Sequence, residues 1–189
     1  IIRRASSVSE AGGLGIITGN GLDAEKLRQQ IKLCRTLTDK PFGVNIVMQD
    51  ISDTVENFVN MLIEENVKIV ITSAGSPKKW LPVMKEHGMT VMCVVGNVIQ
   101  AQKCEALGAD AIIAEGCESG GHIGEITTMV LTPAVCDAVK IPVVTAGGIA
   151  DGRGMAAAFM LGAEGVQCGT AFLLTEEATV SDEYKKRVL

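Results

Sequence analysis

The stretches "LGADAIIAEG", Leu107–Gly116, and "LGAEGVQCGT", Leu161–Thr170, repeat one pattern in the same order. Each begins with Leu-Gly-Ala and an acidic residue, and continues into a short apolar run that ends near a glycine. Glycine commonly ends a helix, and an apolar run without polar alternation is typical of a strand buried on both faces. The two stretches therefore predict one repeated unit, in which a helix closes and a strand opens.

Working outward, similar short apolar runs alternate with helical stretches along the whole chain. This alternation predicts parallel strands joined by helical crossovers. The strand candidates are residues 14–18, 43–47, 68–72, 90–95, 111–115, 142–146 and 165–168.

Two architectures are built from such units, an open doubly wound sheet and a closed eight-stranded barrel. The open form needs G-x-G-x-x-G directly after an early strand, whereas "EAGGLGIITG", residues 10–19, has its glycines before the strand. We therefore expect an α/β fold of the (β/α)8 TIM-barrel class, as one domain over residues 1–189. Because the chain starts without Met and in what reads as the end of a helix, we expect a fragment whose first strand lies upstream.

Helix boundaries are indicated at three places. Asp151 is a candidate N-cap for a helix that Gly162 ends, and Thr132-Pro133 reads as an N-cap followed by proline at the first helical position. The predicted helices therefore begin after Asp151 and at Pro133.

Composition excludes several classes of protein. Hydrophobic residues make up 47% and charged residues 21%, which is typical of a protein with a buried sheet. The net charge of -5 gives no electrostatic reason to expect nucleic acid or an anionic membrane. Six scattered cysteines without C-x-x-C indicate reduced thiols in a cytoplasmic protein, and no metal site is predicted.

Two glycine loops follow the last two predicted strands. In a barrel of this class phosphate usually binds there, and "TAGGIADG", residues 145–152, and "VQCGT", residues 166–170, could both present bare backbone N–H groups. The candidate phosphate ligands are Gly147, Gly148, Gly169 and Thr170.

A third loop, "EGCESGGHIGEITT", holds one of the two histidines of the chain. His122 is a candidate general acid or base, since an imidazole exchanges protons near neutral pH and its glycine neighbours leave it open to a ligand. Glu115 ends the preceding strand and faces the same side. Asn45, within "FGVNIVM", is either a buried hydrogen-bonding spacer or a contact to a planar ligand.

The chain resembles the flavin-dependent family that unites enoyl-acyl-carrier-protein reductase II with nitronate monooxygenase. The resemblance rests on "SEAGGLGIITG", "TDKPFGVNI", "GADAIIAEGCESGGHIGEITTM" and "IPVVTAGGIADGRGMAAAFMLGAEGVQCGT", in this order. It implies an FMN whose phosphate is held by the glycine loops, with Asn45 and Glu115 near the ribityl chain or ring. Gly120, Gly121 and His122 would lie against the flavin.

The resemblance also implies the activity. In the reductase branch NADH or NADPH reduces FMN, and a trans-2-enoyl thioester on acyl carrier protein is the substrate. In the monooxygenase branch the matching histidine removes the proton next to a nitro group. Ile after the histidine and Thr-Thr-Met beyond it, in "GGHIGEITTM", favour the reductase. A homodimer is plausible from resemblance alone, the family's C-terminal segment is not found in this sequence, and a phosphate-binding barrel without redox chemistry stays an alternative.

Overall fold

The computed structural model describes residues 2–49, 54–121 and 124–188. The chain falls into two compact units. The first comprises residues Ile1–Val91 and Glu177–Thr179, and the second Met92–Glu176 and Val180–Leu189.

The first unit is a parallel sheet with helical crossovers. Its strands lie in the order β1-β2-β3, and Ile17 is opposite Val44, which in turn is opposite Val70. These three residues are fully buried, so the centre of the sheet is apolar. The elements are α1 (Ile2–Glu10), β1 (Gly15–Thr18), α2 (Ala24–Leu37), β2 (Phe42–Val47), α3 (Thr54–Glu64), β3 (Ile69–Ser73) and α4 (Leu81–Glu86).

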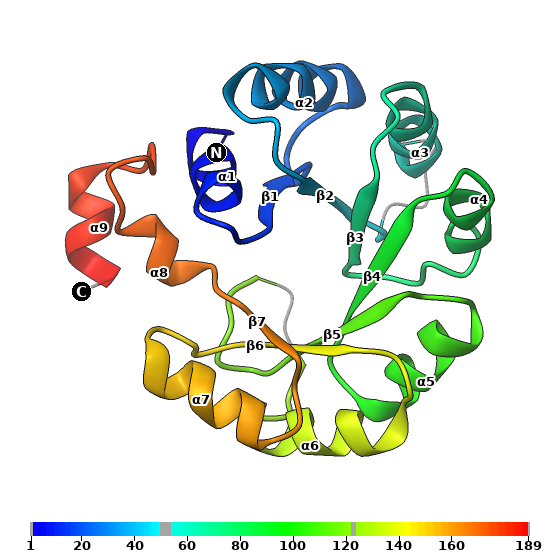
Figure 1. The fold of residues 1–189 in the computed structure, drawn as a ribbon, viewed down its shortest axis with the longest axis vertical. Coiled ribbons are helices and arrows are strands. Elements are labelled where there is room, and N and C mark those ends of the chain that lie inside the picture. The colour runs from blue at the N-terminus through cyan, green and yellow to red at the C-terminus, as the bar shows by residue number, and fades with distance from the viewer. Residues whose placement is uncertain (1, 50–53, 122–123, 189) are drawn as a thin grey trace. The chain divides into compact units, whose positions relative to one another are not determined.

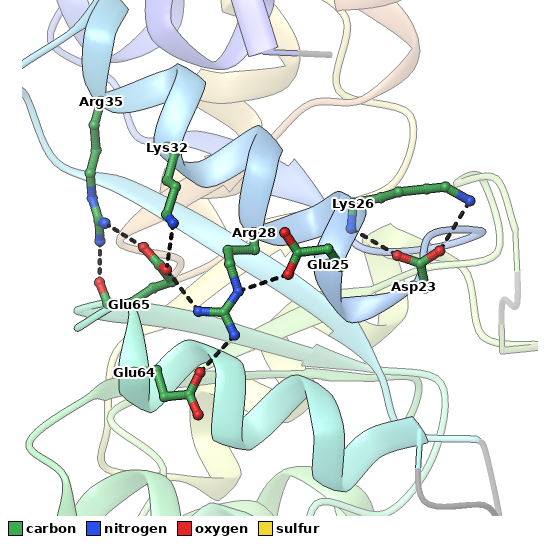
Figure 2. A network of polar contacts seen from close by, with 8 residues as sticks. All are labelled: Asp23, Glu25, Lys26, Arg28, Lys32, Arg35, Glu64 and Glu65. Carbon is green, nitrogen blue, oxygen red and sulfur yellow. Dashed lines mark hydrogen bonds and ion pairs between the residues drawn. The ribbon is translucent and has the colours of Figure 1, made fainter.

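Helix α2 packs between α1 and α3 on one side of this sheet (Figure 1). Leu27 and Ile31 lie one helical turn apart on its buried face. On the outer surface, ion pairs join basic residues of α2 to Glu64 and Glu65 at the end of α3 (Figure 2).

The second unit continues the same pattern. Its strands are parallel and lie in the order β4-β5-β6-β7. Helices α5, α6 and α7 lie on one side of them (Figure 1). The elements are β4 (Thr90–Val95, which begins in the first unit), α5 (Val98–Ala106), β5 (Ala111–Glu115), α6 (Thr128–Ala138), β6 (Val143–Ala146), α7 (Gly152–Met160), β7 (Gly165–Gln167), α8 (Thr170–Leu173) and α9 (Asp182–Val188).

The predicted strands are confirmed, each boundary to within one residue. The repeated Leu-Gly-Ala-acid pattern also does what its sequence predicts. Gly108 and Gly162 have φ of +93° and +99° just after α5 and α7, a conformation that glycine adopts without a steric penalty. Asp151 caps α7 as expected, accepting the N–H groups of Arg153 and Gly154.

The boundary predicted at Thr132-Pro133 is wrong. Helix α6 begins at Thr128, and Pro133 lies inside it. The earlier start is held by Glu118, whose carboxylate accepts the N–H of Thr128 at 2.9 Å. The bond that Pro133 cannot make would go to the carbonyl of Met129, an exposed residue in the first turn of the helix.

The six cysteines are free thiols; Cys34, Cys93 and Cys104 are buried and the other three are half-buried. Within the described residues, no helix has the length and apolar character that crossing a membrane requires.

Candidate functional site

The ends of three strands in the second unit form one row. Glu115 of β5 is opposite Ala146 of β6, which is opposite Gln167 of β7. Because the strands are parallel, the loops that follow them leave the same edge of the sheet. The register therefore brings together the three loops that the sequence singled out.

Glu115 is half-buried at the end of β5. Burial raises the pKa of its carboxyl above the ordinary value, and the nearby hydroxyl of Ser119 partly offsets this effect. The hydroxyl oxygen of Ser119 is itself buried and makes no hydrogen bond of normal geometry within the described residues. The predicted site thus contains a carboxyl that protonates more readily than one in water, next to a hydroxyl without a hydrogen bond of normal geometry.

The loop after β5 is closed by its own backbone. Cys117 donates its N–H to the carbonyl of Ile126 at 2.9 Å, and Ser119 donates to Gly116 at 3.1 Å. Gly120 and Gly121 are exposed, and a methyl group at either would meet no atom of the described residues within 4 Å. This open backbone leaves room for a ligand. His122, the predicted catalytic residue, lies outside the described residues, and its role stays a prediction.

The loop after β6 requires glycine. Gly147 and Gly148 have φ of +108° and +70°. A Cβ at Gly147 would lie 2.6 Å from the Thr128 hydroxyl oxygen, so no side chain fits there. Within the described residues the N–H of Gly148 donates no hydrogen bond, which leaves it available to an acceptor.

The loop after β7 leads into the short helix α8. Gly169 is the N-cap of this helix, and no side chain bonds to the helix end. A methyl group at Gly169 would meet nothing within 4 Å, and both Gly169 and Thr170 are exposed. Bare N–H groups beside a threonine hydroxyl match the acceptor oxygens of a phosphate, so the residues present fit the phosphate end of FMN.

Asn45 lies in β2 of the first unit. Its side-chain amide donates to the Ser73 hydroxyl at 3.0 Å and to the carbonyl of Ile71 at 3.3 Å. Both partners lie in the neighbouring strand β3. These bonds support the reading of Asn45 as a hydrogen-bonding spacer, and its contact with a ligand stays a prediction.

Two residues of the second unit that the sequence did not single out are Glu118 and Thr128. The Glu118 carboxylate accepts both the N–H and the hydroxyl of Thr128, each at 2.9 Å. The sequence does contain an acidic residue before Thr127 and Thr128, where a helix could begin. Because ten residues separate Glu118 from Thr128, however, the sequence alone does not indicate that they pair.

The chain matches the family model described as nitronate monooxygenase over residues 2–59 and 47–189. In structure it is similar to FabK from Thermotoga maritima, with 51% identity, a TM-score of 0.95, and coverage of 98% of this chain and 59% of that one. It is also similar to nitroalkane oxidase from Streptomyces ansochromogenes, with 30% identity, a TM-score of 0.92, and coverage of 98% and 66%.

A curated relative is (3aS,4S,5R,7aS)-5-hydroxy-7a-methyl-1-oxo-octahydro-1H-indene-4-carboxyl-CoA dehydrogenase of Rhodococcus jostii (strain RHA1), 43% identical over 187 residues. The match covers 99% of this chain and 52% of the relative, so the chain spans about half the length of that protein. These relatives are oxidoreductases.

The structural likeness confirms the predicted fold class, an incomplete (β/α)8 TIM barrel. The family match covers nearly the whole chain, including all three loops at the strand ends. The chain belongs to the nitronate monooxygenase family.

Proposed function

We propose that the protein is an FMN-dependent oxidoreductase that reduces a trans-2-enoyl thioester on acyl carrier protein, with NADH or NADPH as electron donor. The observation that carries the proposal is the 51% identity with FabK, the enoyl-acyl-carrier-protein reductase II, over a stretch that includes the two glycine loops and the His122 loop.

Flavin binding is supported by the geometry of the strand ends. The loops at Gly147-Gly148 and Gly169-Thr170 follow neighbouring strands. Two consecutive glycines with positive φ allow a phosphate to approach the backbone closely, because neither residue has a β-carbon in the way. The half-buried Glu115, one strand away, would then lie toward the ribityl chain or ring.

When bound, FMN would supply the redox chemistry, by accepting two electrons from the nicotinamide cofactor and giving a hydride to the β-carbon of the enoyl thioester. The chain itself has to bind the phosphate, hold the thioester in place and supply a proton to the α-carbon. We assign the last two tasks to His122, because an imidazole can donate a proton near neutral pH.

The reductase is favoured over the monooxygenase by sequence. Identity is 51% with FabK and 30% with the nitroalkane oxidase. The motif "GGHIGEITTM" has Ile after the histidine, as the reductase branch does. Oxidation of nitronates is therefore the second candidate.

The test is the absorbance spectrum of the full-length protein, followed by anaerobic addition of NADH or NADPH. We expect a flavin band that bleaches and that returns on addition of a trans-2-enoyl thioester, offered on acyl carrier protein and on CoA. Restoration by the CoA thioester alone would place the substrate closer to that of the Rhodococcus relative. A flavin band that only a nitronate bleaches would show that the protein is a nitronate monooxygenase. A protein that stays colourless after FMN is added would support the alternative of a phosphate-binding barrel without redox chemistry.

The role of His122 is tested separately. Replacing it with alanine should lower kcat by about 10²–10⁴-fold while FMN stays bound. His87→Ala is a matched control, since His87 ends α4 and bonds through Nδ1 to the Val83 carbonyl at 2.9 Å. A His122→Ala enzyme that works at the wild-type rate would remove His122 from the mechanism.

A further inference from the structure

Thr128 is a junction between three segments of the second unit. It is 8% exposed and is the first residue of α6. Its hydroxyl oxygen lies 2.9 Å from the Glu118 carboxylate in the loop after β5, and 3.1 Å from the carbonyl of Gly147 in the loop after β6. A hydroxyl donates one hydrogen at a time, and an ionised acceptor forms the stronger bond. Glu118 therefore sets the direction in which Thr128 donates.

The three segments are packed without spare room. A Cβ at Gly116 would lie 2.1 Å from the Thr128 hydroxyl oxygen, and one at Gly147 would lie 2.6 Å from the same atom. On the other side, a Cβ at Gly148 would lie 3.3 Å from the Cβ of Glu118. A shift of Glu118 or Thr128 would therefore displace the backbone of both loops.

Glu118 also completes the start of α6. The N-cap residue, Thr127, makes no side-chain bond to the helix, and the N–H of Thr128 is taken by Glu118 instead. A carboxylate is favoured at this end of a helix by the helix dipole. The bonds from the Thr128 N–H and hydroxyl hold the pKa of the Glu118 carboxyl below its ordinary value, against a smaller opposing effect of burial.

We infer that Glu118 is a positioning residue of the site: through Thr128 it holds the loop that carries Gly120 and Gly121 in register with the glycine loop after β6. The inference rests on the proposed function, in which the first loop would lie against the flavin and the second would hold its phosphate. It adds that both contacts would depend on one carboxylate.

The experiment uses the full-length protein with Glu118→Gln, which keeps the size of the side chain and removes its charge. Thr128→Val is the second variant, since it removes the hydroxyl and keeps the N–H. Glu125→Gln is the control, because Glu125 is an exposed acid of the same loop and has no hydrogen bond or ion pair within the described residues.

Backbone hydrogen exchange is measured first, without any ligand. The informative amides are Gly116, which donates to the Ala146 carbonyl at the end of β6, and Cys117, which donates to Ile126. We expect Glu118→Gln to speed exchange of both amides, and Thr128→Val to speed exchange of Gly116. The control should match the wild type. Faster exchange confined to the first turn of α6 would overturn the inference, because Glu118 would then be a helix cap and nothing more.

FMN affinity and turnover are measured next. Glu118→Gln should raise the dissociation constant of FMN about fivefold or more and lower kcat about tenfold or more, with KM for the enoyl thioester changed less than about threefold, because small misplacements of reacting groups act mainly on the rate. Wild-type values for both quantities would overturn the inference. A wild-type protein that binds no FMN would instead refute the proposed function, and hydrogen exchange would still decide whether Glu118 couples the loops.

Discussion

Arg28 of α2 donates from Nη1 to Oε1 of Glu65 at 2.8 Å, and so ties the second helix to the turn that follows the third (Figure 2). Three carboxylates contact this guanidinium, and they differ in exposure: that of Glu25, which accepts from Nε at 3.1 Å, is 67% exposed. The Glu65 side chain is 10% exposed and also contacts Arg35, whereas the Glu64 side chain is 61% exposed. The same arginine thus forms one sheltered ion pair, with Glu65, and two solvated ones, with Glu25 and Glu64.

This difference predicts unequal effects on stability. Glu65→Gln should lower the free energy of unfolding by about 1–2 kcal/mol, since bonds to charged groups are the stronger ones and the partly exposed arginines reduce the effect. Glu64→Gln should change it by less than about 0.5 kcal/mol. Urea denaturation of both variants at neutral pH measures the difference, and equal values would contradict the role of burial.

The Glu65 pair should also weaken in acid. Burial alone would raise the pKa of the Glu65 carboxyl, but the hydrogen bond from Arg28 and the charges of Lys32, Arg28 and Arg35 outweigh it, so the pKa lies below its ordinary value. A carboxyl with a lowered pKa stabilises the fold above its unfolded-state pKa, and loses this contribution as the pH falls through its folded-state pKa. The difference between wild type and Glu65→Gln should therefore be largest near neutral pH and shrink in acid. A difference that stays constant with pH would show that the charge of Glu65 is not involved.

Gly147 should tolerate no side chain. Gly147→Ala places a Cβ 2.6 Å from the Thr128 hydroxyl oxygen at a φ of +108°, so we expect a loss of at least about 2 kcal/mol of unfolding free energy. Gly152→Ala is the control, since a Cβ there meets nothing within 4 Å at the start of α7. It should leave stability unchanged or raise it by up to about 1 kcal/mol. Thermal unfolding of the two variants is the measurement, and a stable Gly147→Ala protein would be inconsistent with the close packing at Thr128.

Ser119 should be replaceable by alanine. Its buried hydroxyl lies near Glu115 but makes no hydrogen bond of normal geometry within the described residues, so Ser119→Ala removes a poorly satisfied group and should raise the unfolding free energy by up to about 1 kcal/mol. Ser181→Ala should have the opposite sign and lower it by about 1 kcal/mol, because the Ser181 hydroxyl accepts the N–H of Tyr184 at the start of α9. Denaturant titrations compare the two, and a destabilised Ser119→Ala protein would mean that the hydroxyl bonds to Glu115.

The sequence by itself determined the repeating helix–strand units and the loops that carry the site. A strand that is buried on both faces is a continuous apolar run, and a helix often ends at a glycine because glycine adopts a positive φ. Both features depend on neighbouring residues only, so they can be recognised directly in the sequence. The strand boundaries, the ends at Gly108 and Gly162, and the Asp151 cap all followed from this. The expected cofactor and reaction came from the family resemblance, because the pattern of apolar residues along the chain indicates only the fold.

Only the tertiary structure decided which side chains meet. The start of α6 was misplaced because Pro133 is a strong local signal, while the group that fixes the real start, Glu118, lies ten residues before Thr128. The bonds from Asn45 to β3 likewise join residues that lie 26 and 28 positions apart in the sequence. The close packing around Thr128 depends on glycines from two loops. Such contacts depend on strand register and loop closure, which bring distant residues together and which local sequence does not specify.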